Sequence, residues 1–163
     1  MSQVLAMPVA PADGTEMNQT LRSETRSRSV RLAALPSAVP WARRVVRHTL
    51  RGWRLESLSD PVLLLVSELV TNAVEASKTV PCLDQAGHPM ISLTVELRDA
   101  SLLVKVWDAD PGLPVLQEAD LTGDRGRGLV LVDFLADAWG HHDHEQGKVV
   151  WCEIGRGSVP PRD

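Results

Sequence analysis

The chain is short of cysteine and of long apolar runs, and each shortage excludes a class of protein. Its two cysteines, Cys82 and Cys152, lie 70 residues apart with no CxxC partner, so neither a disulfide framework nor a zinc spacing is present. No basic segment followed by an apolar run opens the chain, and no uninterrupted apolar stretch of about 18 residues occurs. We therefore expect neither export nor a membrane span, and interpret the sequence as a cytoplasmic protein with buried or unreactive thiols.

Negative charge is scarce in the first third of the chain. Nine arginines and one glutamate lie between residues 22 and 54, a local charge of +8 in a protein of net charge −4. Arg43, Arg47, Arg51 and Arg54 recur there at helical spacing, so we expect a stripe that contributes to docking of a protein partner. Direct nucleic-acid binding is disfavoured, because the stripe has no base-stacking aromatic residue and the protein as a whole is acidic.

With 163 residues and 44% hydrophobic content, the chain can bury one core, so we expect one domain. Residues 1–27 mix Ser, Thr, Pro, Gly and charges without periodicity, and we interpret them as a mobile arm. The domain then covers residues 28–156, and residues 157–163 form a tail.

Periodicity predicts an order of strand, two helices, two strands, loop, helix and two strands. The expected elements are a strand at 29–35, a helix at 37–53 capped by Ser37, a helix capped by Ser59 or Asp60, a hairpin of 91–97 with 102–108, a loop at 111–127, a helix at 128–139 and a closing hairpin that turns near 145–147. Early helices and hairpin-paired strands predict an α+β fold, a two-layer sandwich with a mixed, mostly antiparallel sheet and helices on one face.

The second expected helix carries a carboxylate and a carboxamide one turn apart, Glu68 and Asn72. At about 100° per residue they share an arc with Glu75, while the apolar residues occupy the opposite arc. Any amphipathic helix has a polar face, so this arc is also what a solvated surface looks like. An acid and an amide oxygen at this spacing can, however, hold Mg²⁺ and activate a neighbouring hydroxyl.

Asp108 ends an expected strand and is followed at once by Ala, Asp, Pro and Gly112. Such a carboxylate can accept a hydrogen bond from an exocyclic amine, and the glycine lets the backbone approach a flat ring. An aspartate that simply begins a turn is the competing interpretation.

A glycine-rich segment, residues 123–128, precedes the third helix. Exposed N–H groups at a helix N-terminus, with Arg125 and Arg127 nearby, form a natural phosphate cradle. The segment is neither a dinucleotide-fold turn, because a loop precedes it, nor a P-loop, because it lacks the Lys-Ser/Thr pair.

The run of His141, His142, Asp143 and His144 invites a metal interpretation. Alternate strand residues share a face, so His142 and His144 lie on one side. Two imidazoles without a third spaced ligand make a poor zinc site, and a solvated strand end or turn is the preferred interpretation.

Over residues 29–155 the order and spacing of the motifs resemble the N, G1, G2 and G3 boxes of the GHKL, or Bergerat-fold, ATPases. The similarity is greatest to the branch of anti-sigma-factor serine/threonine kinases, short ATP-binding regulators of actinobacteria. The matching segments are Glu68-x-x-x-Asn72, Asp108-x-x-x-Gly112, Gly126-Arg127-Gly128-Leu129 and Gly147-Lys148-Val149-Val150. Asp110 stands where the G1 box has its first glycine, and Val149 stands where the G3 box has a threonine.

The resemblance implies ATP and Mg²⁺ as cofactors and a role for each box. Asn72 would coordinate the Mg²⁺ that bridges the ATP phosphates, and Glu68 would act as catalytic base. Asp108 would receive the adenine amino group and Gly112 would let the adenine pack. The remaining nucleotide-binding positions are Arg125, Gly126, Arg127, Gly128, Leu129 and Val149, and residues 113–127 correspond to the ATP lid.

The implied function is a serine/threonine protein kinase and anti-sigma-type partner switch that phosphorylates a STAS-type anti-anti-sigma protein. The resemblance also allows a sigma factor as a second partner and a homodimeric assembly. The alternative is a non-catalytic, nucleotide-dependent protein-interaction module. A histidine kinase fragment is disfavoured, because no dimerisation helix with a phosphoacceptor histidine precedes residue 29.

Overall fold

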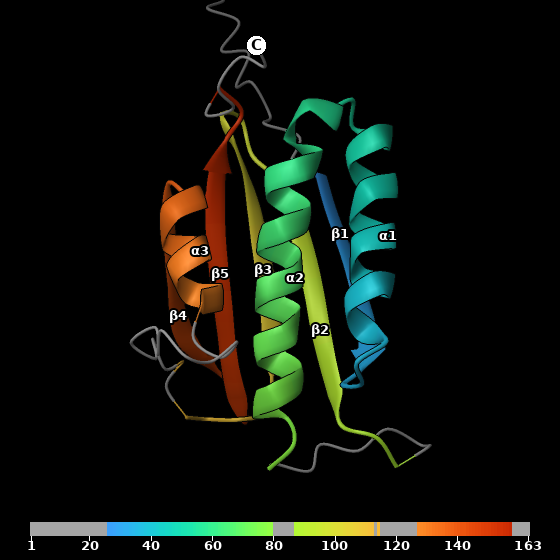
Figure 1. Ribbon diagram of the computed structural model, residues 1–163, viewed down its shortest axis with the longest axis vertical. Helices are drawn as coiled ribbons and strands as arrows, with labels where there is room; N and C mark the ends of the chain where they lie inside the picture. Colours follow the sequence, from blue (N-terminus) through green and yellow to red (C-terminus); the bar gives the residue numbers. More distant parts are fainter. Residues whose placement is uncertain (1–25, 80–86, 113, 115–126, 158–163) are drawn as a thin grey trace, which may run out of the picture.

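The computed structural model describes residues 26–79, 87–112, 114 and 127–157, and the expected arm, lid and tail lie largely outside these ranges. Five strands and three α-helices follow the predicted order (Figure 1). The elements are β1 (Arg26–Ala33), α1 (Ala38–Gly52), a 3₁₀ turn (Glu56–Leu58), α2 (Ser59–Ala76), β2 (Met90–Leu97), β3 (Ser101–Asp108), α3 (Arg127–Leu135), β4 (Ala138–His144) and β5 (Gly147–Gly155).

The strands form one sheet in the order β1-β2-β3-β5-β4, and every strand pair in the described residues is antiparallel. The predicted α+β fold is therefore confirmed. A mixed, mostly antiparallel sheet was expected, and the strand pairs among the described residues are all antiparallel. All three helices cover the same face, with α2 between α1 and α3 (Figure 1). This two-layer arrangement agrees with a Bergerat-type fold.

The core lies between the helices and the middle of the sheet. β2 buries Ile91, Leu93 and Val95 in strict alternation, because successive side chains of a strand point to opposite faces. α1 buries one residue per turn, and α2, in the centre of the helix layer, buries eight of its residues. The buried residues of α1 are Ala38, Ala42, Val46 and Leu50.

The segment Glu56–Ala76 is long and apolar enough to span a membrane by length and composition. In the fold half of its most apolar window is buried, and α2 packs on the central strands of the sheet (Figure 1). Packing in the protein core therefore accounts for its composition.

The helices α1 and α2 begin close to the predicted residues, but the predicted side-chain caps do not form. α1 does begin after Ser37, but the Ser37 side chain makes no capping hydrogen bond. α2 begins at Ser59, so Ser59 and Asp60 lie inside its first turn and Leu58 is the N-cap. The 3₁₀ turn Glu56–Leu58 continues directly into α2, so the start of α2 needs no side-chain cap.

Strand and helix ends also moved. β1 begins at Arg26, three residues before the expected strand and inside the expected arm. α3 ends at Leu135 rather than at residue 139, because β4 takes over at Ala138. The two predicted hairpins are confirmed, and the second turns at 145–146, where Glu145 has a φ of 53°.

Candidate functional site

The polar arc of α2 lies at the edge of the buried helix face. Glu68 and Asn72 are half-buried, whereas Thr71 and Glu75 are exposed. The opposite arc is fully packed, and Val66, Leu69, Val70 and Ala73 there are at most 2% exposed. The predicted separation of an apolar and a polar arc is confirmed. Glu68 and Asn72 are more buried than residues of a fully solvated helix surface would be.

Burial raises the pKa of the Glu68 carboxyl above its ordinary value, since desolvation disfavours the charged form. Within the described ranges no hydrogen bond or ion pair reaches the Glu68 carboxylate or the Asn72 carboxamide. A half-buried, unpaired carboxylate is suited to accept a proton, and an amide oxygen is a ligand of the kind that Mg²⁺ takes. Asn72 therefore fits as a Mg²⁺ ligand and Glu68 as a base.

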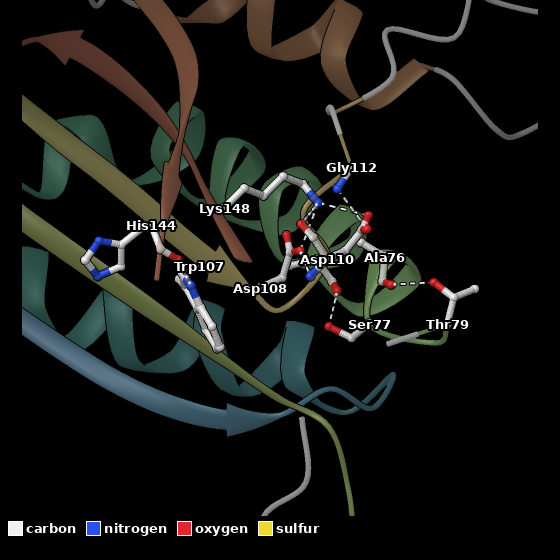
Figure 2. A network of polar contacts seen from close by, with 10 residues as sticks. Ala76, Ser77, Thr79, Trp107, Asp108, Asp110, Gly112, His144 and Lys148 are labelled. Atoms are coloured by element: carbon white, nitrogen blue, oxygen red, sulfur yellow. Dashed lines mark hydrogen bonds and ion pairs between the residues drawn. The ribbon is translucent and has the colours of Figure 1, made fainter. Parts of the chain in front are cut away.

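Asp108 is the last residue of β3, and it is only 1% exposed. It lies directly opposite Lys148 of β5, and strand alternation places both on the face that packs against the helices. The Lys148 ammonium donates to Asp108 Oδ1 over 2.9 Å, to the Asp110 carbonyl over 2.9 Å and to Asp110 Oδ2 over 3.1 Å. Figure 2 shows this cluster beside the C-terminal end of α2, with Ala76, Ser77 and Thr79 next to it.

Desolvation and Lys148 act on Asp108 in opposite directions. Burial raises the pKa of the Asp108 carboxyl, while the hydrogen bond and the charge of Lys148 and the N–H of Asp110 lower it, and burial has the larger effect. The Asp110 N–H donates to Asp108 Oδ1 over 3.0 Å. Asp108 is thus a buried acceptor with one oxygen already engaged.

The turn after β3 is closed by Asp110, the residue that replaces the first glycine of the G1 pattern. The Gly112 N–H donates to Asp110 Oδ1 over 3.0 Å, and this bond, ahead of Lys148, lowers the pKa of the Asp110 carboxyl. A Cβ at Gly112 would lie 3.1 Å from Asp110 Oδ1, tighter than ordinary contact. Asp110 therefore shapes a turn in which position 112 has little room for a side chain.

Gly147 allows β5 to approach the end of β3. A Cβ on it would overlap the Asp108 carbonyl oxygen and lie 2.9 Å from Ala109 Cα, both of them backbone atoms that cannot swing aside. The glycine of the G3 segment is therefore required for the packing that brings Lys148 to Asp108.

Val149 is placed differently from the expectation. Val150, Cys152 and Ile154 face the helices with Lys148, so alternation turns Val149 to the other face of the sheet, opposite Trp107. Its side chain does not point toward Asp108. Sequence reasoning missed Lys148, and its position immediately after the G3 glycine was the one signal that could have identified it.

The phosphate-binding positions are only partly described. Arg125 and Gly126 lie outside the described residues. Arg127 and Gly128 open α3, and the Arg127 side chain is not described. Leu129 is 5% exposed and belongs to the core, so the group that it can offer a nucleotide is its backbone in the first helical turn. α3 packs alongside α2 (Figure 1).

The described residues contain no metal-binding cluster of three or more His, Cys, Asp or Glu. His142 and His144 share a side of β4, as predicted, with ring centroids 6.5 Å apart, and both are exposed. Cys152 is a buried free thiol whose pKa burial raises to about 12, which agrees with the expected unreactive cysteine, and Cys82 lies outside the described residues.

The functional groups are arranged along α2 in a consistent order. Asp108 lies beside the C-terminal end of α2, near Ala76 and Ser77 (Figure 2). Asn72 precedes Ala76 by about 6 Å of axial rise, and Glu68 lies about 6 Å further away. This order suits an elongated ligand with a base at Asp108, phosphates at Asn72 and a reacting end near Glu68.

Residues 32–154 match the family model of the histidine kinase-like ATPase domain, and the protein belongs to this family. The fold is similar to that of the RsbU and RsbW domains of Rv1364c from Mycobacterium tuberculosis, with a TM-score of 0.50 and 20% sequence identity. That similarity covers 78% of this chain and 31% of the other, so this chain spans about a third of that protein's length. No curated protein matches the chain. The predicted membership of the GHKL ATPases is confirmed, and it implies ATP as the ligand.

Proposed function

We propose that the protein is an ATP-dependent serine/threonine kinase that phosphorylates a STAS-type anti-anti-sigma protein and thereby acts as a cytoplasmic partner switch in transcription. The proposal rests on the environment of Glu68. Its carboxyl group is half-buried and has no partner among the described residues, and burial raises its pKa. A nucleotide-binding module that transfers nothing does not need such a group, because an unpaired, partly desolvated carboxylate costs stability.

The proposed step transfers the γ-phosphoryl group of ATP to a partner hydroxyl. The serine oxygen bonds to the γ-phosphorus as the bond from that phosphorus to the β,γ-bridging oxygen breaks, and ADP leaves with the electron pair. Glu68 accepts the hydroxyl proton and returns it to solvent. Asp108 receives the base amino group, and Asn72 holds Mg²⁺, which supplies charge neutralisation at the phosphates when bound.

The motifs that resemble those of anti-sigma-factor kinases support the partner class. A sigma factor is proposed as the second partner, bound when the STAS protein is phosphorylated and unable to compete, and a homodimer is the proposed assembly.

Transfer of ³²P from γ-labelled ATP to STAS proteins of the same genome tests the proposal. The wild-type protein should label a serine of one of them in the presence of Mg²⁺. Glu68→Gln should lower the rate at least about 100-fold, as is typical for loss of a general base, and leave ATP bound. Glu75→Gln, at an exposed position of the same polar arc, should keep the wild-type rate.

An unchanged rate in Glu68→Gln would make Glu68 part of an ordinary polar face. Tight ATP binding without transfer to any STAS protein would instead identify the non-catalytic interaction module.

A further inference from the structure

Lys148 is a buried cation, 4% exposed, and the second residue of β5. Its three ammonium protons meet three acceptors, Asp108 Oδ1, the Asp110 carbonyl and Asp110 Oδ2. An ammonium has three donors and no acceptor, so Lys148 has no proton left for a phosphate or a base. Its contacts fasten the end of β3 and the following turn to β5 (Figure 2).

The cluster holds two carboxylates against one ammonium. The charged groups that act on Asp108 are Lys148 of β5 and Asp110 of the turn. Ser77, the C-cap of α2, contributes only a hydroxyl, which donates to the Ala73 carbonyl over 2.7 Å, and Glu75 of α2 is exposed and paired with Lys78. The cluster therefore keeps an excess of negative charge at a buried carboxylate. A ligand with N–H donors can donate hydrogen bonds to this carboxylate.

We propose that Lys148 is a positioning residue, which with Asp110 holds the ionised Asp108 carboxylate as acceptor for the exocyclic amine of the base. This inference rests on the proposed ATP-binding function. Lys148 engages one oxygen of Asp108 and fixes the plane of the carboxylate, and it offsets the cost of burying the charge. Asp110, which stands where the G1 pattern has its first glycine, supplies Lys148 with a side-chain acceptor, Oδ2, that a glycine would lack.

Removal of Lys148 should therefore weaken recognition of the amine rather than of the whole nucleotide. Without it the desolvation of Asp108 is uncompensated, so the carboxyl takes up a proton at higher pH and loses its role as a pure acceptor. A hydrogen bond to a charged group distinguishes ligands by about tenfold or more, which sets the size of the expected effect.

The test compares the affinity for ATP with that for purine riboside triphosphate, which lacks only the amine. The wild-type protein should prefer ATP, and Lys148→Met should lose that preference by about tenfold, with the larger loss at lower pH. Both ligands carry the same phosphates, so protonation of the phosphates cancels in the ratio. Lys105→Met is the matched control, because Lys105 lies on β3 and pairs with Glu96 away from the turn.

Lys148→Arg, which keeps the charge, should retain most of the preference. If Lys148→Met fails to fold, Lys148→Gln replaces it, with the same expected loss. The inference would be contradicted if folded Lys148→Met kept the wild-type ratio of ATP affinity to analogue affinity, or if Lys105→Met lost the preference for ATP equally. Lys148 would then serve only in a structural ion pair.

The proposed function can fail separately. A wild-type protein that binds ATP no better than the analogue overturns the inference and leaves the kinase proposal standing, whereas one that binds neither overturns the kinase proposal. In that case carboxyl-carbon NMR of the nucleotide-free protein still tests Lys148. The pKa of Asp108 should be higher in the Lys148 variant than in the wild type, and equal values would contradict the inference.

Discussion

At the scale of single residues, the protein places carboxylates where water is partly excluded. Glu68 is desolvated without a partner in the described structure, whereas Asp108 is desolvated with Lys148 beside it. Glu68 is free to exchange a proton, and Asp108 is held as an acceptor. From this difference in partners we propose different roles for the carboxyl groups of Glu68 and Asp108.

Glu68 should make the folded state less stable at neutral pH. Its folded pKa is raised, so the cost of burying the charge is complete above that pKa and vanishes below the unfolded value of about 4.3. Glu68→Gln should therefore raise the urea midpoint at pH 8 and match the wild type near pH 3. Glu75→Gln, which breaks only an exposed pair with Lys78, should show no such gain. A gain that persists at pH 3 would contradict this account.

Among the glycines whose surroundings the structure describes, Gly147 tolerates a side chain least. Gly147→Ala should destabilise the protein by about 1–3 kcal/mol or more, because the new methyl group meets the backbone of Asp108 and Ala109. Gly52→Ala, at the end of α1 with nothing within 4 Å, should leave stability unchanged or slightly raised. Urea denaturation of both variants measures the contrast, and equal stabilities would contradict the close approach of β5 to β3.

At the scale of elements, the arginines of α1 fall into two groups, one that contacts α2 and one that is exposed to solvent. Arg43 Nη1 donates to the Leu63 carbonyl over 3.1 Å and to Ser67 Oγ over 2.7 Å, so it ties α1 to α2. Its expected place in a docking stripe is thus not supported, whereas Arg47, Arg51 and Arg54 are exposed. Position on a helical wheel gave the direction of Arg43 only approximately, since the neighbouring helix decided its contacts.

The outer face of α1 also contains an aromatic residue, contrary to the sequence-based expectation. Trp41 is 55% exposed, and the Arg44 guanidinium lies 5.6 Å from its ring centroid. With Arg28, Arg47 and other α1 residues, these two line an open hollow of about 430 Å³. We call this surface the arginine face, and it presents several cations without an acidic neighbour among its lining residues.

The arginine face should steer an acidic protein partner. Arg44→Glu with Arg47→Glu should slow association with the STAS or sigma partner at low salt, leave ATP affinity unchanged, and approach the wild type as salt rises. Surface plasmon resonance across a salt series measures the association rate, and unaltered rates would make the face an ordinary solvated surface.

Arg43→Met should instead cost about 1–2 kcal/mol of stability, because its two hydrogen bonds to α2 are lost.

At the scale of the whole molecule, patterns in the sequence predicted the element order, the hairpins and the α+β architecture, since periodicity reflects which face of an element is buried. The polar arc of α2 and the strand-end position of Asp108 followed from the same reasoning. The pair of Asp108 and Lys148 did not, because it depends on strand register between residues 40 positions apart. Val149 was assigned from its motif position alone, without the alternation that turns it away from Asp108.

The central claim is that α2 and the end of β3 form one Mg-ATP site. Isothermal titration with ATP, with Mg²⁺ and with the metal chelated, tests it most directly on the wild type, Asn72→Ala and the exposed neighbour control Thr71→Ala. We expect wild type and Thr71→Ala to bind ATP more tightly with Mg²⁺, and a folded Asn72→Ala to lose that Mg²⁺-dependent gain. Equal Mg²⁺-dependent affinity in Asn72→Ala, or no ATP binding by the wild type, would contradict the claim.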